Sequence, residues 1–155
     1  MVASRTLPVV ERRAVTIDGG MALSKIDQTQ VDGRGQTVTH YVETLPYFLD
    51  SDGVGLWVIV PAGKFFNFEG DDLIEFVRLC VRRLLDVGGV AVRHTPTGEP
   101  PLLWVEQTHY GTEPSEIVEG VIAEWLAAGG KDPEWDWLWF VTRRVLETRR
   151  NFRRE

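Results

Sequence analysis

GDDLIEFVRLCVRRLLDVGGVAVRHTPTGEPPLLWVEQ, residues 70–107, is the stretch that most clearly specifies its own structure. It opens with two aspartates, which favour a helix N-terminus, and Gly88-Gly89 ends the helical pattern. Two apolar runs follow, residues 90–94 and 102–107, with a turn at residues 95–98 between them. The stretch therefore predicts a helix followed by a β-hairpin. Apolar residues recur at helical spacing in its first half: Leu73, Val77, Cys80, Val81 and Leu84.

Further elements are expected on both sides of this unit. Upstream, β-branched and apolar residues predict strands at 14–18, 37–45 and 54–61. Downstream, Thr112 or Glu113 can cap a second helix, which ends at Gly129-Gly130. With a last helix, the predicted order is β-β-β-α-β-β-α-α in a single α+β domain with one antiparallel sheet. The expected organisation is a flexible arm (1–12), the domain (13–150) and a basic tail (151–155).

The last helix is predicted from DPEWDWLWFVTRR, residues 132–144. Its tryptophans occupy every second position, as in a strand, but Asp132-Pro133-Glu134 opens the stretch as a helix opens. No turn signal interrupts 134–150, which is too long for most strands, so we predict one helix over 133–150. Trp137 and Trp139 would then point about 200° apart, and the helix would lie between its own domain and a second surface. Arginines would form the polar rim: Arg143, Arg144, Arg149 and Arg150.

Charge is distributed unevenly along the 155 residues. The net charge is −6, but residues 143–155 carry six arginines and two glutamates, or +4, which leaves −10 for the rest. An acidic body argues against general nucleic-acid binding, although the tail could contact RNA, an acidic partner or the body itself. No apolar run is long enough for a membrane span, and no signal-peptide core is present, so we expect a cytoplasmic protein.

The sequence contains no catalytic or metal-binding motif. His40, His94 and His109 are far apart, and Cys80 lies on an apolar helix stripe, as a core residue would. We therefore expect no enzyme, no cofactor and no metal site. The one alternative is an unfamiliar active site at Glu106–Tyr110, where Glu106, His109 and Tyr110 follow a strand.

GKFFNFEG, residues 63–70, places three phenylalanines where polar turn residues would be usual. Some of them must belong to the core, and the functional alternative is a hydrophobic groove for a partner peptide. Together with the C-terminal aromatic stretch, they complete the set of residues expected to bind a partner: Phe65, Phe66, Phe68, Trp135, Trp137, Trp139, Phe140, Arg143 and Arg144.

The element order resembles the superfamily of class I type III secretion chaperones and bacterial YbjN-type proteins. The resemblance rests on VRRLLDVGGVAVRHTPTGEPPLLWVEQ and TEPSEIVEGVIAEWL and covers about residues 36–128. The usual N-terminal helix is not evident, and the tryptophan-rich helix is additional. The resemblance implies a non-enzymatic binding protein, chaperone- or adaptor-like and often a homodimer, that holds a segment of a partner protein. The alternative is an acidic immunity protein that neutralises a basic toxin.

Overall fold

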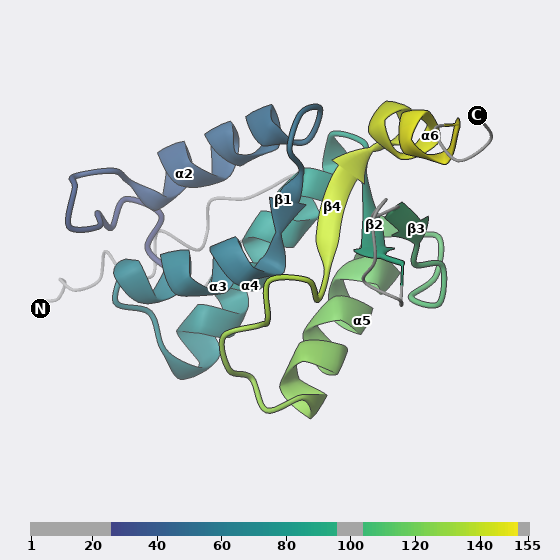
Figure 1. The fold of residues 1–155 in the computed structure, drawn as a ribbon. Coiled ribbons are helices and arrows are strands. Elements are labelled where there is room, and N and C mark those ends of the chain that lie inside the picture. Colours follow the sequence, from purple (N-terminus) through teal and green to yellow (C-terminus); the bar gives the residue numbers. More distant parts are fainter. Residues whose placement is uncertain (1–25, 96–103, 152–155) are drawn as a thin grey trace, which may run out of the picture.

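A computed structural model describes residues 26–95 and 104–151 of the chain and has mixed helices and strands, so the α+β class is confirmed (Figure 1). The predicted strand at 14–18 and the arm at 1–12 lie outside the described residues. The elements are α2 (Val38–Thr44), the 3-10 helix η1 (Leu45–Phe48), β1 (Val54–Gly55), α3 (Leu56–Phe65), α4 (Gly70–Asp86), β2 (Gly89–His94), β3 (Trp104–Glu106), α5 (Pro114–Ala127), β4 (Trp139–Thr142) and α6 (Arg143–Asn151).

The four strands form one antiparallel sheet in the order β1-β4-β2-β3. The strand that comes last in the sequence, β4, therefore lies inside the sheet, between the short β1 and β2 (Figure 1). Phe140 of β4 is paired with Val54 on one side and with Ala91 on the other. This placement brings the C-terminal part of the chain against the start of α3.

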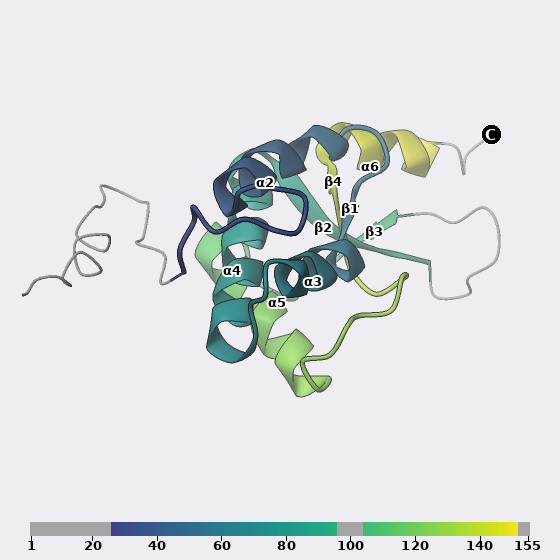
Figure 2. The same cartoon turned by 90° about the vertical axis from the view of Figure 1, so that its left-hand side faces the viewer.

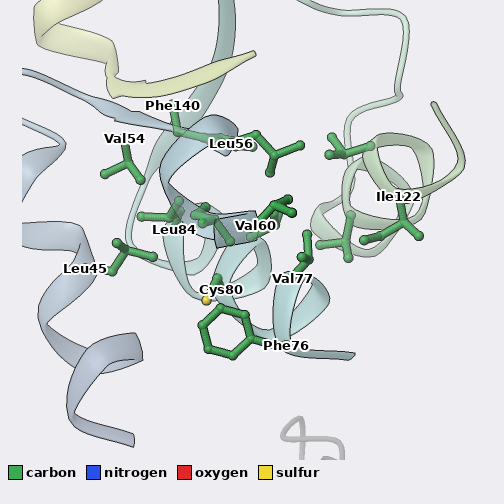
Figure 3. Packing of buried hydrophobic residues seen from close by; sticks show 14 of the residues in the cluster. Leu45, Val54, Leu56, Val60, Phe76, Val77, Cys80, Leu84, Ile122 and Phe140 are labelled. Atoms are coloured by element: carbon green, nitrogen blue, oxygen red, sulfur yellow. The ribbon is translucent and has the colours of Figure 1, made fainter. Parts of the chain in front are cut away.

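The two faces of the sheet carry two separate apolar clusters, because side chains alternate along each strand. Phe140 points into the main core, which α3, α4 and α5 build with residues such as Cys80 and Ile122 (Figure 3). Trp139 and Val141, its neighbours on β4, point to the other face. There they pack with Val92, Trp104, Val145 and Leu146, the last two supplied by α6.

The helix–hairpin–helix part of the prediction is confirmed. The helix expected at 70–88 is α4, the strands expected at 90–94 and 102–107 pair as β2 and β3, and the helix expected after Glu113 is α5 (Figure 2). Residues 96–103, which include most of the expected turn, lie outside the described residues. The start of α5 shows why this prediction succeeds. Pro114 occupies the first helical position, and the Glu116 carboxylate accepts a hydrogen bond of 3.1 Å from the Glu113 backbone N–H.

The prediction of strands at 37–45 and 54–61 is wrong. The first segment is α2, where the Thr37 side chain caps the helix by accepting from the His40 N–H, and Val38 and Val42 bury one face. The second forms a strand only at Val54–Gly55 and then continues as α3. The Thr37 cap and the burial of valines in α2, and the burial of Leu56, Ile59 and Val60 in α3, outweigh the β preference of valine and threonine.

The prediction of one helix over 133–150 is also wrong. Residues 139–142 form β4, and α6 begins only at Arg143, where the Thr142 hydroxyl accepts from the Val145 N–H at 3.2 Å. The predicted element order is therefore not the observed one. Trp137 packs against the main core of its own chain, and the Arg93 guanidinium lies 5.2 Å from its ring centroid. We expected a second surface against this segment only because a single helix would point Trp137 and Trp139 in opposite directions. Since that helix does not form, the reason for expecting a second surface is gone.

Candidate binding surface

Helix α3 is apolar on nearly all sides, and one of its faces remains in contact with solvent. Leu56, Ile59 and Val60 are buried in the main core. Its other large apolar residues lie within about 100° of the helix circumference at 100° per residue. Trp57 is 38% exposed and Phe65 56%, so large apolar side chains occupy this face, where a surface helix usually presents polar ones, and Lys64 lies at its edge. The exposed residues of this face are Trp57, Val58, Pro61 and Phe65.

Trp135, in the loop before β4, extends this face towards the sheet. The Trp57 ring centroid lies 6.5 Å from that of Trp139, which lies 5.9 Å from that of Trp135 in an edge-on arrangement. The Trp139 indole N–H also donates a hydrogen bond of 2.8 Å to the Trp135 carbonyl. Trp135 itself is 48% exposed. We call Trp57, Val58, Pro61, Phe65 and Trp135 together the apolar strip.

Gly55 permits the close approach of the tryptophans. A Cβ atom at this position would lie 2.8 Å from the Trp57 indole nitrogen and 3.0 Å from Cε2 of Trp139. Real Cβ contacts are almost never so short, so any side chain here would displace one of the two rings. The glycine therefore allows the N-terminal end of α3 to lie directly against β4.

The Trp135 ring is part of a stack of aromatic rings on the sheet. The His94 ring lies between Trp104, at 4.2 Å between centroids, and Trp135, at 5.0 Å, in stacked arrangements with both. Trp104 is buried on the second face of the sheet. Such ring pairs add to the free energy gained by burial, and they hold one face of Trp135 against the sheet.

The opposite end of the apolar strip borders a recess of about 310 Å³ between α3 and the loop that precedes α2. Val58, Pro61 and Phe65 line it together with Tyr41. The Arg34 guanidinium lies 5.5 Å from the Phe65 ring centroid, so a cation stands at this rim. The recess thus has an apolar wall and a polar edge.

Acidic residues lie close to Trp135 in the sequence of the loop before β4. Asp132 is paired with Lys64 at 2.6 Å, which ties the loop to α3. Glu134 and Asp136, the two sequence neighbours of Trp135, are exposed and form no ion pair within 26–95 and 104–151. The two ends of the apolar strip therefore differ in charge. Two carboxylates without an ion pair to any described residue are sequence neighbours of Trp135, whereas the recess at Phe65 has both the Arg34 guanidinium and the Asp32 carboxylate.

The residues suspected of catalysis are not brought together as a trio. Glu106 pairs with Arg143 on α6, with oxygen–nitrogen distances of 2.9 and 3.1 Å. His109 and Tyr110 instead bond to Glu124 of α5, at 3.1 and 2.6 Å. The Arg93 guanidinium also reaches Glu124, at 2.6 Å.

These hydrogen bonds and the nearby charge change the pKa values of Glu124 and Tyr110. Partial burial opposes ionisation of Glu124, but the hydrogen bonds from Tyr110 and His109 and the charge of Arg93 outweigh it, so its pKa is lowered. Burial, followed by the hydrogen bond to Glu124, raises the pKa of Tyr110. The carboxylate is stabilised as an anion, which suits a structural link between β2, α5 and the intervening loop.

The other candidate groups for chemistry are dispersed. His40 is exposed on α2, and Cys80 is buried in the main core, where burial raises the pKa of its thiol well above the ordinary value. Within the described ranges, no three His, Cys, Asp or Glu side chains are placed to hold a metal ion. None of the helices in those ranges is long and apolar enough to cross a membrane.

The residues expected to bind a partner divide into three groups. Trp135 and Phe65 lie on the apolar strip, and Trp139 supports it from below. Arg143 and Arg144 pair with Glu106 and Asp50 at the start of α6. The remaining four pack in or against the main core: Phe66, Phe68, Trp137 and Phe140.

Sequence reasoning missed three residues of the apolar strip. Trp57, Val58 and Pro61 lie in an uninterrupted apolar run, which we interpreted as a buried strand. The spacing of Trp57, Pro61 and Phe65 at every fourth position was the available helical signal.

Comparison with known proteins gives no match. No family model matches the chain, and neither the curated proteins nor the solved structures give a significant match. The surface described above is therefore the basis for a functional proposal.

Proposed function

We propose that this chain is a non-enzymatic protein-binding module whose apolar strip holds a segment of a partner protein. The observation that carries the proposal is the solvent-facing side of α3, where the exposed Trp57 and Trp135 both contact the Trp139 ring. Contiguous apolar surface of this kind is typical of interaction sites. Tryptophan is also the residue type most often found to dominate the binding free energy of protein interfaces.

Rigid support for the apolar strip favours binding. Trp135 is stacked on His94 and bonded through its carbonyl to Trp139, so its ring needs little ordering when a partner arrives. A surface that is already ordered loses less conformational entropy on association. A mobile tryptophan on a loop would lack this advantage.

We retain a chaperone- or adaptor-like mode of action in the cytoplasm, with a homodimer as one possible assembly, as part of this proposal. The expected resemblance to secretion chaperones rested on element order, and the segment 37–45 departs from that order. Support therefore comes from the apolar strip rather than from the order of elements. A second copy of the chain is a partner that sedimentation measurements would detect.

The test compares partners recovered from native lysate by three forms of the protein: wild type, Trp57→Ala/Trp135→Ala, and Tyr47→Ala. Tyr47 is a suitable control because it is 77% exposed on η1, outside the apolar strip. Mass spectrometry should find proteins that wild type and Tyr47→Ala retain and the double variant loses. Recovery of the same proteins by all three forms, with circular dichroism showing each one folded, would contradict the proposal.

The acidic body supports a second candidate, an immunity protein that neutralises one basic toxin. This role predicts a single tight partner whose association rate falls steeply with salt. A chaperone- or adaptor-like module should instead bind several apolar segments with weaker dependence on salt. Stopped-flow measurements with the recovered partner at two salt concentrations distinguish the two.

A further inference from the structure

We propose that the segment held by the apolar strip is basic at one end, where an arginine or lysine side chain rests on the open face of Trp135 between Glu134 and Asp136. Apolar residues of the same segment would cover Trp57, Val58 and Phe65. This inference rests on the proposed function and names the chemistry and the direction of the partner.

The geometry of Trp135 suits a cation. One face of its ring stacks on His94, with 27° between the planes, and the ring meets that of Trp139 in an edge-to-face arrangement. The residue is nevertheless 48% exposed, so ring surface remains open to solvent. Tryptophan is the aromatic side chain that attracts a cation most strongly, and the attraction acts over the face of the ring.

Charge complementarity supports the same occupant. Glu134 and Asp136 flank Trp135 in the sequence, and both are exposed without an ion pair to any described residue. By contrast, Asp132 in the same loop is paired with Lys64. Two unpaired carboxylates on the sequence neighbours of an exposed tryptophan give a local negative potential that a basic side chain would satisfy.

The other end of the apolar strip fixes the direction. Arg34 stands over Phe65 and Asp32 lines the same recess, so this end carries one charge of each sign and lacks the excess of carboxylates found near Trp135. Trp57 and Phe65 are eight positions apart on α3, roughly 12 Å along the helix axis. The residue of the partner segment that meets Trp57 should therefore lie about four extended residues from the one that meets Phe65, with the basic residue at the Trp57 end of the segment.

Three peptides test the inference. Each has ten residues and the same apolar residues, and they differ at two positions that carry arginine, serine or glutamate. Calorimetric titration at low and high salt should rank them arginine, serine, glutamate, from tightest to weakest. The cation–π contact alone accounts for about a two- to fivefold preference of arginine over serine, and the preference should shrink at high salt.

A charge-matched pair of variants locates the effect. Glu134→Gln/Asp136→Asn should lose the preference for the arginine peptide and still bind the serine peptide. Glu43→Gln/Asp52→Asn removes the same charge from exposed residues elsewhere and should keep the preference. If the control loses the preference equally, net charge rather than this site is responsible and the inference is wrong.

The remaining outcomes separate the inference from the proposed function. If the three peptides bind wild type equally and Trp57→Ala/Trp135→Ala abolishes binding, the basic partner is wrong and the binding module stands. If the glutamate peptide binds most tightly, the inference is likewise overturned. If no peptide binds wild type, or if the peptides bind Trp57→Ala/Trp135→Ala as tightly as they bind wild type, both proposals fail.

Discussion

The Tyr110 hydroxyl donates a hydrogen bond of 2.6 Å to the Glu124 carboxylate and so ties the loop after β3 to α5. Tyr41 has a buried hydroxyl too, but that hydroxyl has no hydrogen-bond partner among the described residues. The two tyrosines should therefore respond oppositely to removal of their oxygen atoms. Tyr110→Phe should lower the free energy of unfolding by about 1–2 kcal/mol, because a bond to a charged acceptor is lost.

Tyr41→Phe is the matched control in the same urea titration. Burying a hydroxyl without a partner costs free energy, so its removal should leave stability unchanged or raise it. A loss of stability in Tyr41→Phe as large as that in Tyr110→Phe would contradict this account of the two hydroxyls.

Glu124 should also contribute to acid sensitivity. Its pKa in the folded protein is lowered, so its contribution to stability is complete above the pKa of the unfolded chain, about 4.3. That contribution is lost as the pH falls through the folded pKa. Unfolding free energies measured from pH 7 to pH 3 should fall less steeply for Glu124→Gln than for wild type. If the two plots of unfolding free energy against pH have the same slope, Glu124 does not contribute to the pH dependence of stability.

Phe65 and Phe66 are neighbours in the sequence with different environments. Phe66 is 1% exposed in the main core, so Phe66→Ala should cost about 3–5 kcal/mol of unfolding free energy. Phe65→Ala removes an exposed ring of the apolar strip and should change stability by no more than about 0.5 kcal/mol. Thermal unfolding followed by circular dichroism measures both, and equal losses would contradict the observed packing.

Gly55→Ala tests the contact between Trp57 and Trp139. The added methyl group would displace one ring, and overpacking of this kind typically costs about 1–3 kcal/mol. Tryptophan emission should shift at the same time, because Trp57 would move further into water. Unchanged emission and stability would mean that the two rings do not need this glycine.

The helices and strands α4, β2, β3 and α5 could be predicted from the sequence because the local signals agree there. In α4 the apolar stripe, the two N-terminal aspartates and the closing glycines all indicate the same helix. In α5, Pro114 and Glu116 mark the start independently of the apolar pattern. Such agreement leaves little for tertiary contacts to change.

The failures have physical causes in individual residues. Thr37 and Val38 favour strands by propensity, yet the Thr37 cap and the burial of Val38 stabilise a helix. Within an apolar run such as residues 54–61, strand and helix are hard to separate by pattern, and the helical spacing of Trp57 and Pro61 becomes clear only when Phe65 is included. The spacing of the tryptophans at every second position was a sign of extended chain at the start of β4, and we discounted it in favour of Asp132-Pro133.

The candidate surface was less predictable than the fold. Phe65 and Trp135 were anticipated from their aromatic character, but the position of Trp135 near Trp57, through Trp139, depends on β4 entering the sheet beside β1. That pairing joins segments more than eighty residues apart in the sequence and is invisible to local pattern. Trp57, Val58 and Pro61 could therefore not be assigned to a surface before the sheet order was known.

The most direct test of the apolar strip is the affinity of an isolated partner for Trp57→Ala/Trp135→Ala, measured by calorimetry beside Tyr47→Ala. Interface anchors of this kind each contribute more than about 1 kcal/mol, so the double variant should bind at least about tenfold more weakly. Tyr47→Ala should bind as wild type does. Equal affinity of the double variant and wild type, with both proteins folded, would contradict the assignment of this surface to partner binding.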